Sequence, residues 1–406
     1  MRNSILLIAL SLTTSVMTAQ QYQVETDSTK TQTLDEVLVQ SVRVKPNAPI
    51  THSNVTNAQL EPRNLGQDLP ILLNYLPSVV TTSDAGAGIG YTGIRVRGVS
   101  PLSTNITING IPYTDAESLG TFWVNLPDFS SSVESLQLQR GVGTSTNGSG
   151  AFGASINILT DASSKKSSAE ISNTFGSYNT RKHTVKFSTG KLNDVFEVAG
   201  RLSQIKSDGY VDRAFSDLKS YFLQGSYNKN GTLIKALAFG GHERTYQSWF
   251  GLTQEEIDQN RRQNPYTYEN EIDNYKQDHY QLHWNQKIDQ NWSTNIGLNY
   301  TFGRGYFEQF KSDDDVSTYG GIVEATAIDF YGTAVTDLIR RRWLDNDYYV
   351  VNATAHYRDS ELDLTFGGSY STYDGDHFGE VIWAKQFADN ASIRDRYYFG
   401  NGKKTD

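Results

Sequence analysis

The sequence predicts a small mixed α/β domain followed by the antiparallel strands of a transmembrane β-barrel, and two observations carry this fold class. After Asp161, apolar and polar residues alternate with a period of two, as they do in strands that separate lipid from a wet interior. Before Asp161, residues 94–160 combine short β-type segments with tight-turn signals and many glycines. We therefore expect two parts with different architectures.

Composition narrows the classes of protein to consider. The 406 residues carry a net charge of -9, which argues against nucleic acid as a partner because phosphate binding needs a basic face. Cysteine is absent, which excludes disulfides, thiolate metal sites, cysteine nucleophiles and a cysteine-linked lipid anchor. Aromatic residues make up 12% of the chain, as expected where aromatic girdles meet lipid headgroups. After the N-terminus no apolar run approaches the ~20 residues of a membrane-spanning helix, whereas barrel strands stay possible.

The first 19 residues have the pattern of a secretory signal peptide. A short basic start precedes an apolar core at Ile5–Val16, which is too short to span a membrane, and Ala19 offers a small residue for cleavage. The alternative is a buried N-terminal helix. We predict a signal peptide at 1–19 and a disordered segment at 20–50, because its first part is polar and lacks periodicity.

One short apolar stretch interrupts this segment, and it consists of Leu34, Asp35, Glu36, Val37, Leu38 and Val39. Nothing nearby in the sequence is available to bury its leucines and valines. An isolated strand of this kind can join the edge of a partner's sheet through backbone hydrogen bonds. It can equally be the first strand of the following domain, and the residues alone leave both interpretations open. We expect Asp35 and Glu36 to be solvated charges.

Residues 51–161 are predicted to form the mixed α/β domain. Leucines recur at helical spacing over 64–76, with Pro70 in the first turn and Pro77 after the last. Strands are predicted at Ile94–Val96 and Ile106–Ile108, and the second is closed by the tight-turn pair Asn109-Gly110. Two further strands are expected, one leading through Val133, Leu136 and Leu138 to Arg140, the other at Ser155–Leu159.

Two glycine-rich loops have a superficial likeness to nucleotide-binding loops. The sequence GAGIG at 86–90 precedes a strand where a dinucleotide site requires a helix. The sequence NGSGAFG at 147–153 is not followed by the Gly-Lys-Ser/Thr of a phosphate loop. We therefore predict no nucleotide site and no cofactor.

Residues 162–406 are predicted to be barrel strands. The alternating apolar positions are 185/187, 196/198/202, 221/223/227, 280/282/284, 296/298/300/302, 349/351/353/357 and 362/364/366/370. The connections alternate too: short turns near 192–194, 228–231, 289–291 and 359–361 fall between long loops at 207–215, 246–275, 305–346 and 374 onward. Short turns at one end and long loops at the other are typical of outer-membrane barrels, and a soluble β-sandwich offers no reason for them.

Residues 34–161 resemble the plug domain of TonB-dependent outer-membrane receptors. The motifs that carry the resemblance are LDEVLV at 34–39, IRVRG at 94–98, NITINGIPY at 105–113 and VESLQLQRG at 133–141. It implies a folded plug that fills the barrel, with 34–39 as the TonB box, extended into the periplasm for an energised TonB partner. It also implies that Arg97 and Arg140 of the two Arg-Gly signatures pair with barrel glutamates and lock the plug to the wall. By charge alone, either is an ordinary exposed arginine.

The number of strands conflicts with a complete barrel. Plugged barrels have ~22 strands, each of ~9–11 residues, and the alternating segments provide roughly nine or ten. We therefore expect a fragment, a plug plus the N-terminal part of a 22-stranded barrel. A complete barrel of ~10 strands is rejected, because its interior would be filled by side chains.

No catalytic or metal-binding constellation is found in the sequence. His279 and His283 lie four apart on one strand face without a carboxylate at ligand spacing, so we expect them to line the lumen. His242-Glu243 lacks the second histidine of a zinc helix, and 313–315 lacks the glycine and glutamate of an EF-hand. We predict neither an enzyme nor a metal site.

The resemblance implies active import of a scarce ligand across the outer membrane of a Gram-negative bacterium. Expected partners are TonB with its inner-membrane energising complex, outer-membrane lipid, and a ferric siderophore or another iron complex. Haem, cobalamin or an oligosaccharide are alternatives, although little room precedes the box for the extension of glycan importers. A passive porin is the rival class; an enzyme or adhesin on a barrel would need a catalytic or sugar-binding loop. Candidate ligand contacts are Tyr91, Ser100 and Asn105 on turns of the plug, and Trp249, Phe250, Tyr306 and Phe307 on the long loops.

Overall fold

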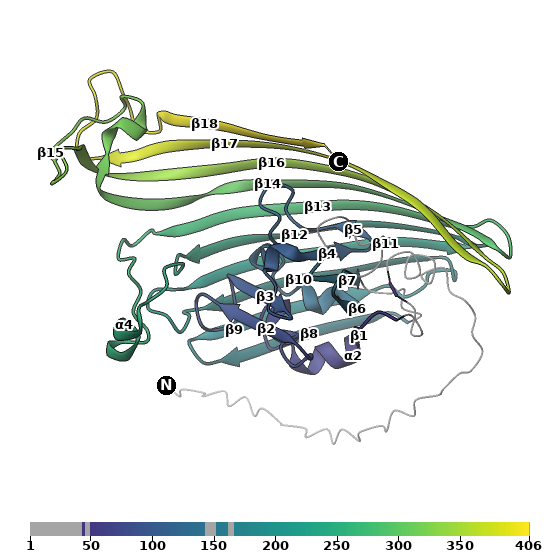
Figure 1. Ribbon diagram of the computed structural model, residues 1–406. Helices are drawn as coiled ribbons and strands as arrows, with labels where there is room; N and C mark the ends of the chain where they lie inside the picture. Colours follow the sequence, from purple (N-terminus) through teal and green to yellow (C-terminus); the bar gives the residue numbers. More distant parts are fainter. Residues whose placement is uncertain (1–42, 45–48, 143–151, 161–165, 406) are drawn as a thin grey trace, which may run out of the picture. The chain divides into compact units, whose positions relative to one another are not determined.

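The computed structural model describes residues 43–44, 49–142, 152–160 and 166–405. The predicted signal peptide, the predicted TonB box at 34–39 and most of the glycine-rich stretch 147–153 lie outside the described residues. The described residues form a small domain that ends at Thr160 and a large sheet that begins at Ser168, both within one compact unit (Figure 1).

The small domain is built on a five-stranded sheet in the order β1-β6-β7-β4-β5. β4 and β7 run parallel, and the other neighbours are antiparallel. Every residue of β7 is buried, as expected for a central strand covered on both faces. A separate hairpin pairs β2 with β3. The strands are β1 (His52–Thr56), β2 (Val79–Ser83), β3 (Thr92–Val96), β4 (Thr104–Ile108), β5 (Ile111–Pro112), β6 (Val133–Arg140) and β7 (Ala154–Thr160).

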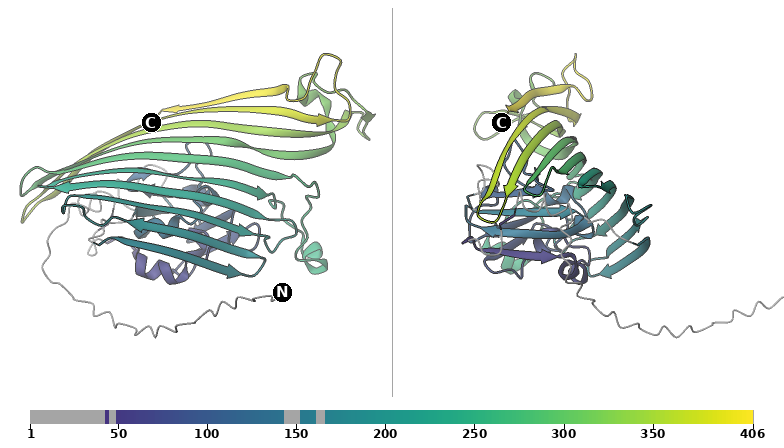
Figure 2. Two further views of the ribbon diagram at one scale, coloured as in Figure 1. Left: turned by 180° about the vertical axis from the view of Figure 1, so that it is seen from behind. Right: turned by 90° about the vertical axis from the view of Figure 1, so that its right-hand side faces the viewer.

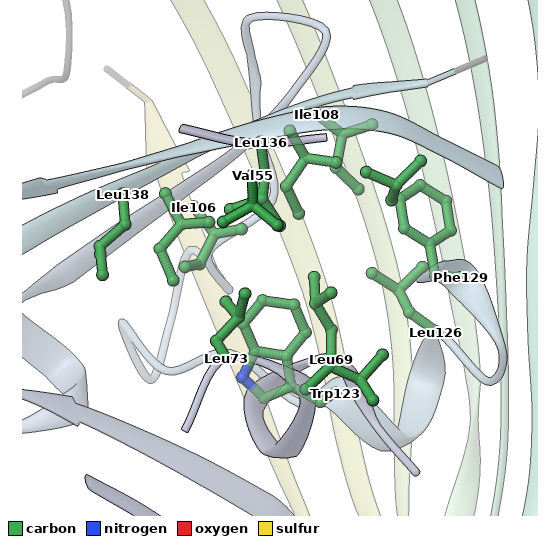
Figure 3. Packing of buried hydrophobic residues seen from close by; sticks show 14 of the residues in the cluster. Val55, Leu69, Leu73, Ile106, Ile108, Trp123, Leu126, Phe129, Leu136 and Leu138 are labelled. Carbon is green, nitrogen blue, oxygen red and sulfur yellow. The ribbon is translucent and has the colours of Figure 1, made fainter. Parts of the chain in front are cut away.

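Short helical segments connect and flank the strands of the small domain. They are α2 (Asn57–Leu60), α3 (Leu69–Leu72) and the 3-10 helices η1 (Glu61–Arg63), η2 (Pro101–Ser103), η3 (Trp123–Asn125) and η4 (Phe129–Ser132). Figure 3 shows Leu69 and Leu73 packed with Trp123 against the apolar side chains of the sheet. Phe129 extends this core into the large sheet, since its ring centroid lies 5.4 Å from that of Phe239. The two parts therefore share one apolar cluster.

The helix predicted over 64–76 is present only as α3. Gly66 has a φ of 120°, far from the helical region, so the helix cannot extend upstream through it. Pro70 lies in the first turn as predicted, and after Leu72 the chain continues in a tighter turn in which Leu73 N donates to Pro70 O. In the described part of the chain, no helix combines the length and apolar character needed to cross a membrane.

Both strands predicted around 94–96 and 106–108 are present, as parts of β3 and β4, but they enter different sheets. Between them Pro101 begins a 3-10 helix, and the Ser100 hydroxyl accepts a hydrogen bond from Leu102 N at 3.3 Å. The Asn109-Gly110 turn forms as predicted, with φ values of 53° and 81° that connect β4 to β5.

The large sheet is antiparallel throughout, with its main strands in the order β18-β17-β16-β14-β13-β12-β11-β10-β9-β8, and the short β15 pairs with β16. Its edges are β8 and β18, so the described strands do not close into a barrel. The strands are β8 (Ser168–Gly176), β9 (Thr180–Ser188), β10 (Phe196–Ser207), β11 (Ser216–Lys229), β12 (Thr232–Tyr246), β13 (Ile272–Lys287), β14 (Trp292–Asp315), β15 (Ala327–Ile328), β16 (Ala334–Arg358), β17 (Asp363–Ala384) and β18 (Arg396–Thr405). Helices α4 (Gln254–Gln259) and η6 (Val316–Tyr319) lie in the long connections.

Two predicted long loops are shorter than expected because the strands beside them extend further. β14 continues to Asp315 and β16 begins at Ala334, within the loop predicted at 305–346. Cross-strand pairs support this extension: Tyr306 lies opposite Trp343, and the Arg341 Nε donates to Glu308 Oε2 at 2.8 Å. In the same way, β17 and β18 occupy much of the region after 374.

The predicted two-faced character of the strands is confirmed. On β9, Val185 and Phe187 are 47% and 45% exposed, whereas Lys182 and Thr184 on the other face are 2% and 3% exposed. On β13, Tyr280, Leu282 and Trp284 are exposed, and the intervening Gln281 and His283 are buried. The small domain lies against one face of the sheet (Figures 1 and 2), and contacts such as that between Asp128 and Lys182 identify it as the polar face. Apolar side chains therefore point away from the domain, as a lipid-facing surface requires.

Candidate functional site

A cavity of about 480 Å³ lies between the small domain and the polar face of the large sheet. Its lining from the small domain is Tyr91, Tyr113, Asp115, Phe122 and Asn125. The sheet and its loops contribute Glu243, Trp249, Asp273, Tyr275, Gln277, Tyr306, Phe307, Leu344 and Asn346. The volume is in the range of small-molecule sites, and a ligand here would touch both parts of the chain.

Glycine brings Tyr91 to the sheet. Gly86, Gly88 and Gly90 all have positive φ, and a Cβ on Gly90 would lie 2.8 Å from the Ser216 hydroxyl of β11. The GAGIG loop therefore serves a close approach to the sheet. Beyond it, the Tyr91 hydroxyl donates to Asp273 Oδ2 at 2.6 Å.

Tyr91 remains a neutral hydrogen-bond donor in this position. Burial, and then the charges of Asp273 and Glu243, raise the pKa of Tyr91 well above its usual value. The Tyr91 hydroxyl also lies 3.5 Å from Glu243 Oε1. The other carboxyl oxygen of Glu243, Oε2, accepts a hydrogen bond from the Thr245 hydroxyl at 3.0 Å. Tyr91 therefore connects the small domain to two buried carboxyl groups of the sheet.

A second segment of the small domain, residues 113–125, lines the cavity after the β4–β5 hairpin. The Tyr113 hydroxyl donates to Gln277 Oε1 at 3.4 Å. Asp115 shapes the following turn, because its Oδ1 accepts from the backbone N of Ser118 at 2.6 Å. Further along, the Tyr373 hydroxyl donates to Glu117 Oε2 at 3.0 Å, which connects this segment to β17.

Aromatic side chains cover the long-loop side of the cavity. The Trp249 ring makes edge-to-face contacts with Tyr91 at 5.7 Å and with Phe307 at 5.9 Å between centroids. The backbone N of Gln247, two residues earlier, donates to Glu271 O at 2.9 Å. This bond holds the start of the β12–β13 connection against its end, so Trp249 has a defined place over the cavity.

The structure brings some predicted ligand residues together and separates others. Tyr91 and Trp249 line the cavity, as do Tyr306 and Phe307. Ser100, Asn105 and Phe250 do not line it, and their role as ligand contacts stays a prediction. Ser100 caps η2, Asn105 accepts from the Thr114 hydroxyl within the small domain, and Phe250 is exposed beside Tyr266.

Several lining residues were missed, although the sequence contained a signal for them. Tyr275 and Gln277 have the same parity on β13 as His279 and His283, which were expected to face the lumen. Both histidines are buried on the polar face, as predicted. Among the described residues, no cluster of side chains is suited to hold a metal ion.

The two arginines predicted to lock the domain to the barrel differ from each other. Arg140 is buried and bonds within the small domain, from Nε to Pro77 O at 3.0 Å and from NH2 to Ser53 Oγ at 2.9 Å. Arg97 is exposed and has a φ of 55°. The ion pairs found among the described residues include neither arginine, so their pairing with barrel glutamates stays a prediction.

An ion pair joins the small domain to the sheet, with the acidic residue on the domain and the basic residues on the sheet. The Asp128 carboxylate lies 2.7 Å from Lys182 Nζ of β9 and 3.7 Å from Arg201 NH1 of β10, with all three side chains buried. The hydroxyls of Thr184 and Ser203 also donate to it. Burial by itself raises the pKa of Asp128, but the charges of Arg201 and Lys182 outweigh burial and hold the pKa below its usual range. We call these three charged residues the Asp128 anchor.

Close backbone contact between β12 and the small domain holds the domain in the same position. A Cβ on Gly241 of β12 would lie 2.5 Å from Asn125 O and 2.6 Å from Pro127 Cδ. We expect Gly241→Ala to displace the 125–127 segment and to destabilise the seated domain by about 1–3 kcal/mol, because an added methyl group overpacks the contact.

Urea unfolding of the purified full-length protein measures this effect. Gly225→Ala on neighbouring β11 is the matched control, since a Cβ there meets nothing within 4 Å. Equal effects of the two substitutions would contradict the close-contact explanation.

The comparisons with known proteins agree with this architecture. Residues 44–155 match the family model of the TonB-dependent Receptor Plug Domain. The probable TonB-dependent siderophore receptor PirA of Acinetobacter baumannii is 25% identical over 237 residues, which are 55% of this chain and 29% of that protein.

Solved structures share the fold. The ferric-catecholate import receptor Fiu from E. coli K12, in its open form, has a TM-score of 0.64 at 14% identity over 88% of this chain and 56% of that one. The siderophore receptor PiuA from Acinetobacter baumannii has a TM-score of 0.60 at 13% identity over 88% and 53%. The chain thus spans about half the length of these structures and less of the curated relative. Residues 44–155 thus match a plug domain of the TonB-dependent receptor type, and the described part of the chain shares its fold with these solved receptors.

Proposed function

We propose that this receptor imports a scarce ligand, an iron complex, across the outer membrane with energy delivered by TonB. The observation that carries the proposal is the cavity of about 480 Å³ between plug and wall. A ligand that contacts both the plug and the sheet can alter the position of the plug. The path through a plugged barrel opens only if the plug moves. A passive porin has no use for such a plug.

The relatives support an iron complex as the ligand. One is described as a probable siderophore receptor, another as a ferric-catecholate import receptor, and a third, at 16% identity, as the ferric citrate transporter FecA. Within the cavity we propose Tyr91 and Trp249 as ligand contacts, together with Tyr113, Tyr306 and Phe307. Haem, cobalamin and oligosaccharides are the alternative ligands.

The proposed partners follow from the surfaces of the chain. Outer-membrane lipid would cover the apolar face that includes Val185 and Phe187 on β9, and this exposed face supports a location in the outer membrane. TonB would pair with residues 34–39 by strand addition. For the Arg-Gly arginines we propose separate roles: Arg140 holds the plug together, and the exposed Arg97 is the candidate for a barrel glutamate.

Deletion of residues 34–39 from the full-length receptor tests the proposal. We expect uptake of a radiolabelled iron complex by cells to fall to background while binding to the cell surface is retained, because the deletion removes the coupling strand and leaves the cavity. A deletion of equal length at 22–27, in the polar part of the same segment, is the control and should leave uptake intact. Unchanged uptake without 34–39 would exclude TonB-driven import.

A further inference from the structure

Four basic side chains gather on the outward face of the large sheet, at the end of the strands that carries the long connections. Arg181 is the second residue of β9, Lys206 the second last of β10, and Arg244 the third from the end of β12. Lys219 lies on β11, two residues after Asp217. We call Arg181, Lys206, Lys219 and Arg244 the outer basic patch.

The strand register places these side chains next to one another. Arg181 lies opposite Lys206 across β9 and β10. Lys206 also lies opposite Asp217, which in turn lies opposite Arg244. Lys219 has the same parity on β11 as Asp217, so both point to the same face. Because neighbouring strands lie ~4.8 Å apart, the patch extends over roughly 14 Å from β9 to β12.

The outer basic patch points away from the small domain. Arg181, Lys219 and Arg244 are exposed, whereas the adjacent residues on the opposite face of the same strands are buried. These buried neighbours are Lys182, Ile205, Leu218 and Glu243. Further from the long connections, the outward face of β9, β10 and β11 carries the exposed apolar side chains of Val185, Leu202 and Leu223. The patch therefore borders the apolar face, at the level where the headgroups of a covering lipid layer would lie.

The positive charge of the patch exceeds the negative charge beside it. Lys206 Nζ lies 2.8 Å from Asp217 Oδ2. Among the described residues, no ion pair includes any of the other three basic side chains. The Arg244 guanidinium lies 4.9 Å from the ring centroid of Phe215, a contact that positions the group and leaves its charge in place. Four basic groups and one carboxylate leave three positive charges in excess.

The surroundings of the patch do not offset this excess. On the next strand, β13, Lys276 and Asp278 pair with each other at 2.7 Å and add no net charge. Within the patch, Arg181 and Lys206 are directly opposed, and like charges in that arrangement destabilise a sheet. An anion that contacts both would remove this repulsion.

We propose that the outer basic patch binds an outer-leaflet lipid whose headgroup carries at least two phosphate groups. Lysine and arginine donate charge-assisted hydrogen bonds to phosphate oxygens. A single phosphate covers only part of a patch roughly 14 Å wide and balances only part of its charge. The apolar face that borders the patch would contact the acyl chains of the same lipid, which favours a lipid over a free anion. The inference rests on the proposed outer-membrane location, and neither the imported ligand nor TonB enters it.

Lipid binding to the purified full-length protein in a neutral detergent tests the proposal, with native mass spectrometry as the measurement. The probes are an acylated glucosamine disaccharide with two phosphates, the same lipid with one phosphate, and phosphatidylcholine. We expect the affinity to fall in that order. The lipid with two phosphates should bind at least about fivefold more tightly than the lipid with one, since each cation near an anionic headgroup contributes about that factor.

Substitutions then locate the site. Lys219→Gln and Arg244→Gln should each weaken binding of the diphosphorylated lipid about fivefold. Asp217→Asn should tighten it several-fold, because the variant lacks the carboxylate of the patch and releases Lys206. Lys229→Gln is the matched control, since it removes the same charge from the same face of β11 at the short-turn end, and it should leave the affinity unchanged.

Three results would overturn the proposal. They are equal affinity for the lipids with one and two phosphates, a loss in Lys229→Gln as large as that in Lys219→Gln, and binding of inorganic pyrophosphate as tight as that of the diphosphorylated lipid, which would show a site for free anions. The proposed function fails separately: uptake that persists without residues 34–39 contradicts TonB-driven import and leaves the lipid site standing.

Discussion

Asp128→Ala is expected to destabilise the seated plug by about 3–5 kcal/mol, because removal of one partner leaves buried charges without compensation. In the Asp128 anchor the carboxylate is the counter-charge of both Lys182 and Arg201, and each of these side chains is only 2% exposed. Urea unfolding of the plug in the purified full-length protein measures the loss. Lys182→Met in the Asp128→Ala background should recover part of it, since one buried cation is then removed.

A surface ion pair of the same wall provides the control. Lys206 Nζ lies 2.8 Å from Asp217 Oδ2, but these side chains are 44% and 30% exposed. Asp217→Ala should therefore change the free energy of unfolding by less than about 1 kcal/mol. If both alanine variants lose the same stability, burial of the Asp128 anchor is not what holds the plug.

The second prediction concerns pH. Burial raises the pKa of Asp68 from 3.8 to about 8, although the Thr92 hydroxyl donates to its Oδ2 at 2.9 Å. An acid with a higher pKa in the folded state binds more protons when folded. Its destabilising contribution is absent below pH 3.8, grows as the pH rises, and is complete above about pH 8. We expect plug stability to fall over this window by up to about 1.4 kcal/mol per pH unit.

Asp68→Asn separates the effect of this group from that of the other carboxyl groups of the protein. The amide keeps an oxygen for Thr92 and cannot ionise, so the variant should be more stable than the parent at pH 8, by a margin that narrows toward pH 5 and vanishes only below about pH 3.8. Urea unfolding at both values measures the difference. Glu61→Gln, at an exposed position of the same domain, is the control. A parent-like loss of stability in Asp68→Asn between pH 5 and 8 would show that other groups cause it.

The alternation of residues along single strands predicted the two faces of the large sheet well. The period of two identified Val185 and Phe187 as outward-facing and His279 and His283 as inward-facing, and the structure agrees for all four. The same alternation, followed toward the start of β13, predicts that Tyr275 and Gln277 face inward, and both line the cavity. Alternation works because each side chain of a strand points opposite to the one before it, whatever lies elsewhere in the chain.

The sequence says less about which loop residues lie together. Tyr91 and Trp249 line one cavity and Ser100 and Asn105 do not, while a ligand role for any of the four stays a prediction. Ser100 and Asn105 are held within the plug by their own hydrogen bonds. Which side of a loop faces the large sheet depends on the residues of distant strands that it contacts. Local periodicity in the sequence does not identify these residues.

The sequence by itself determined the two-part architecture, the outward-facing set of apolar side chains and the tight turn at Asn109-Gly110, because periodicity and turn chemistry are local. Only the tertiary structure decided that Asp128 of the plug meets Lys182 and Arg201 of the wall. It also decided that Tyr91 reaches the carboxyl groups of Glu243 and Asp273. Charged groups and hydrogen-bond donors that are distant in the sequence interact only when the folded sheet brings them together. Their spacing along the chain does not indicate which of them will interact.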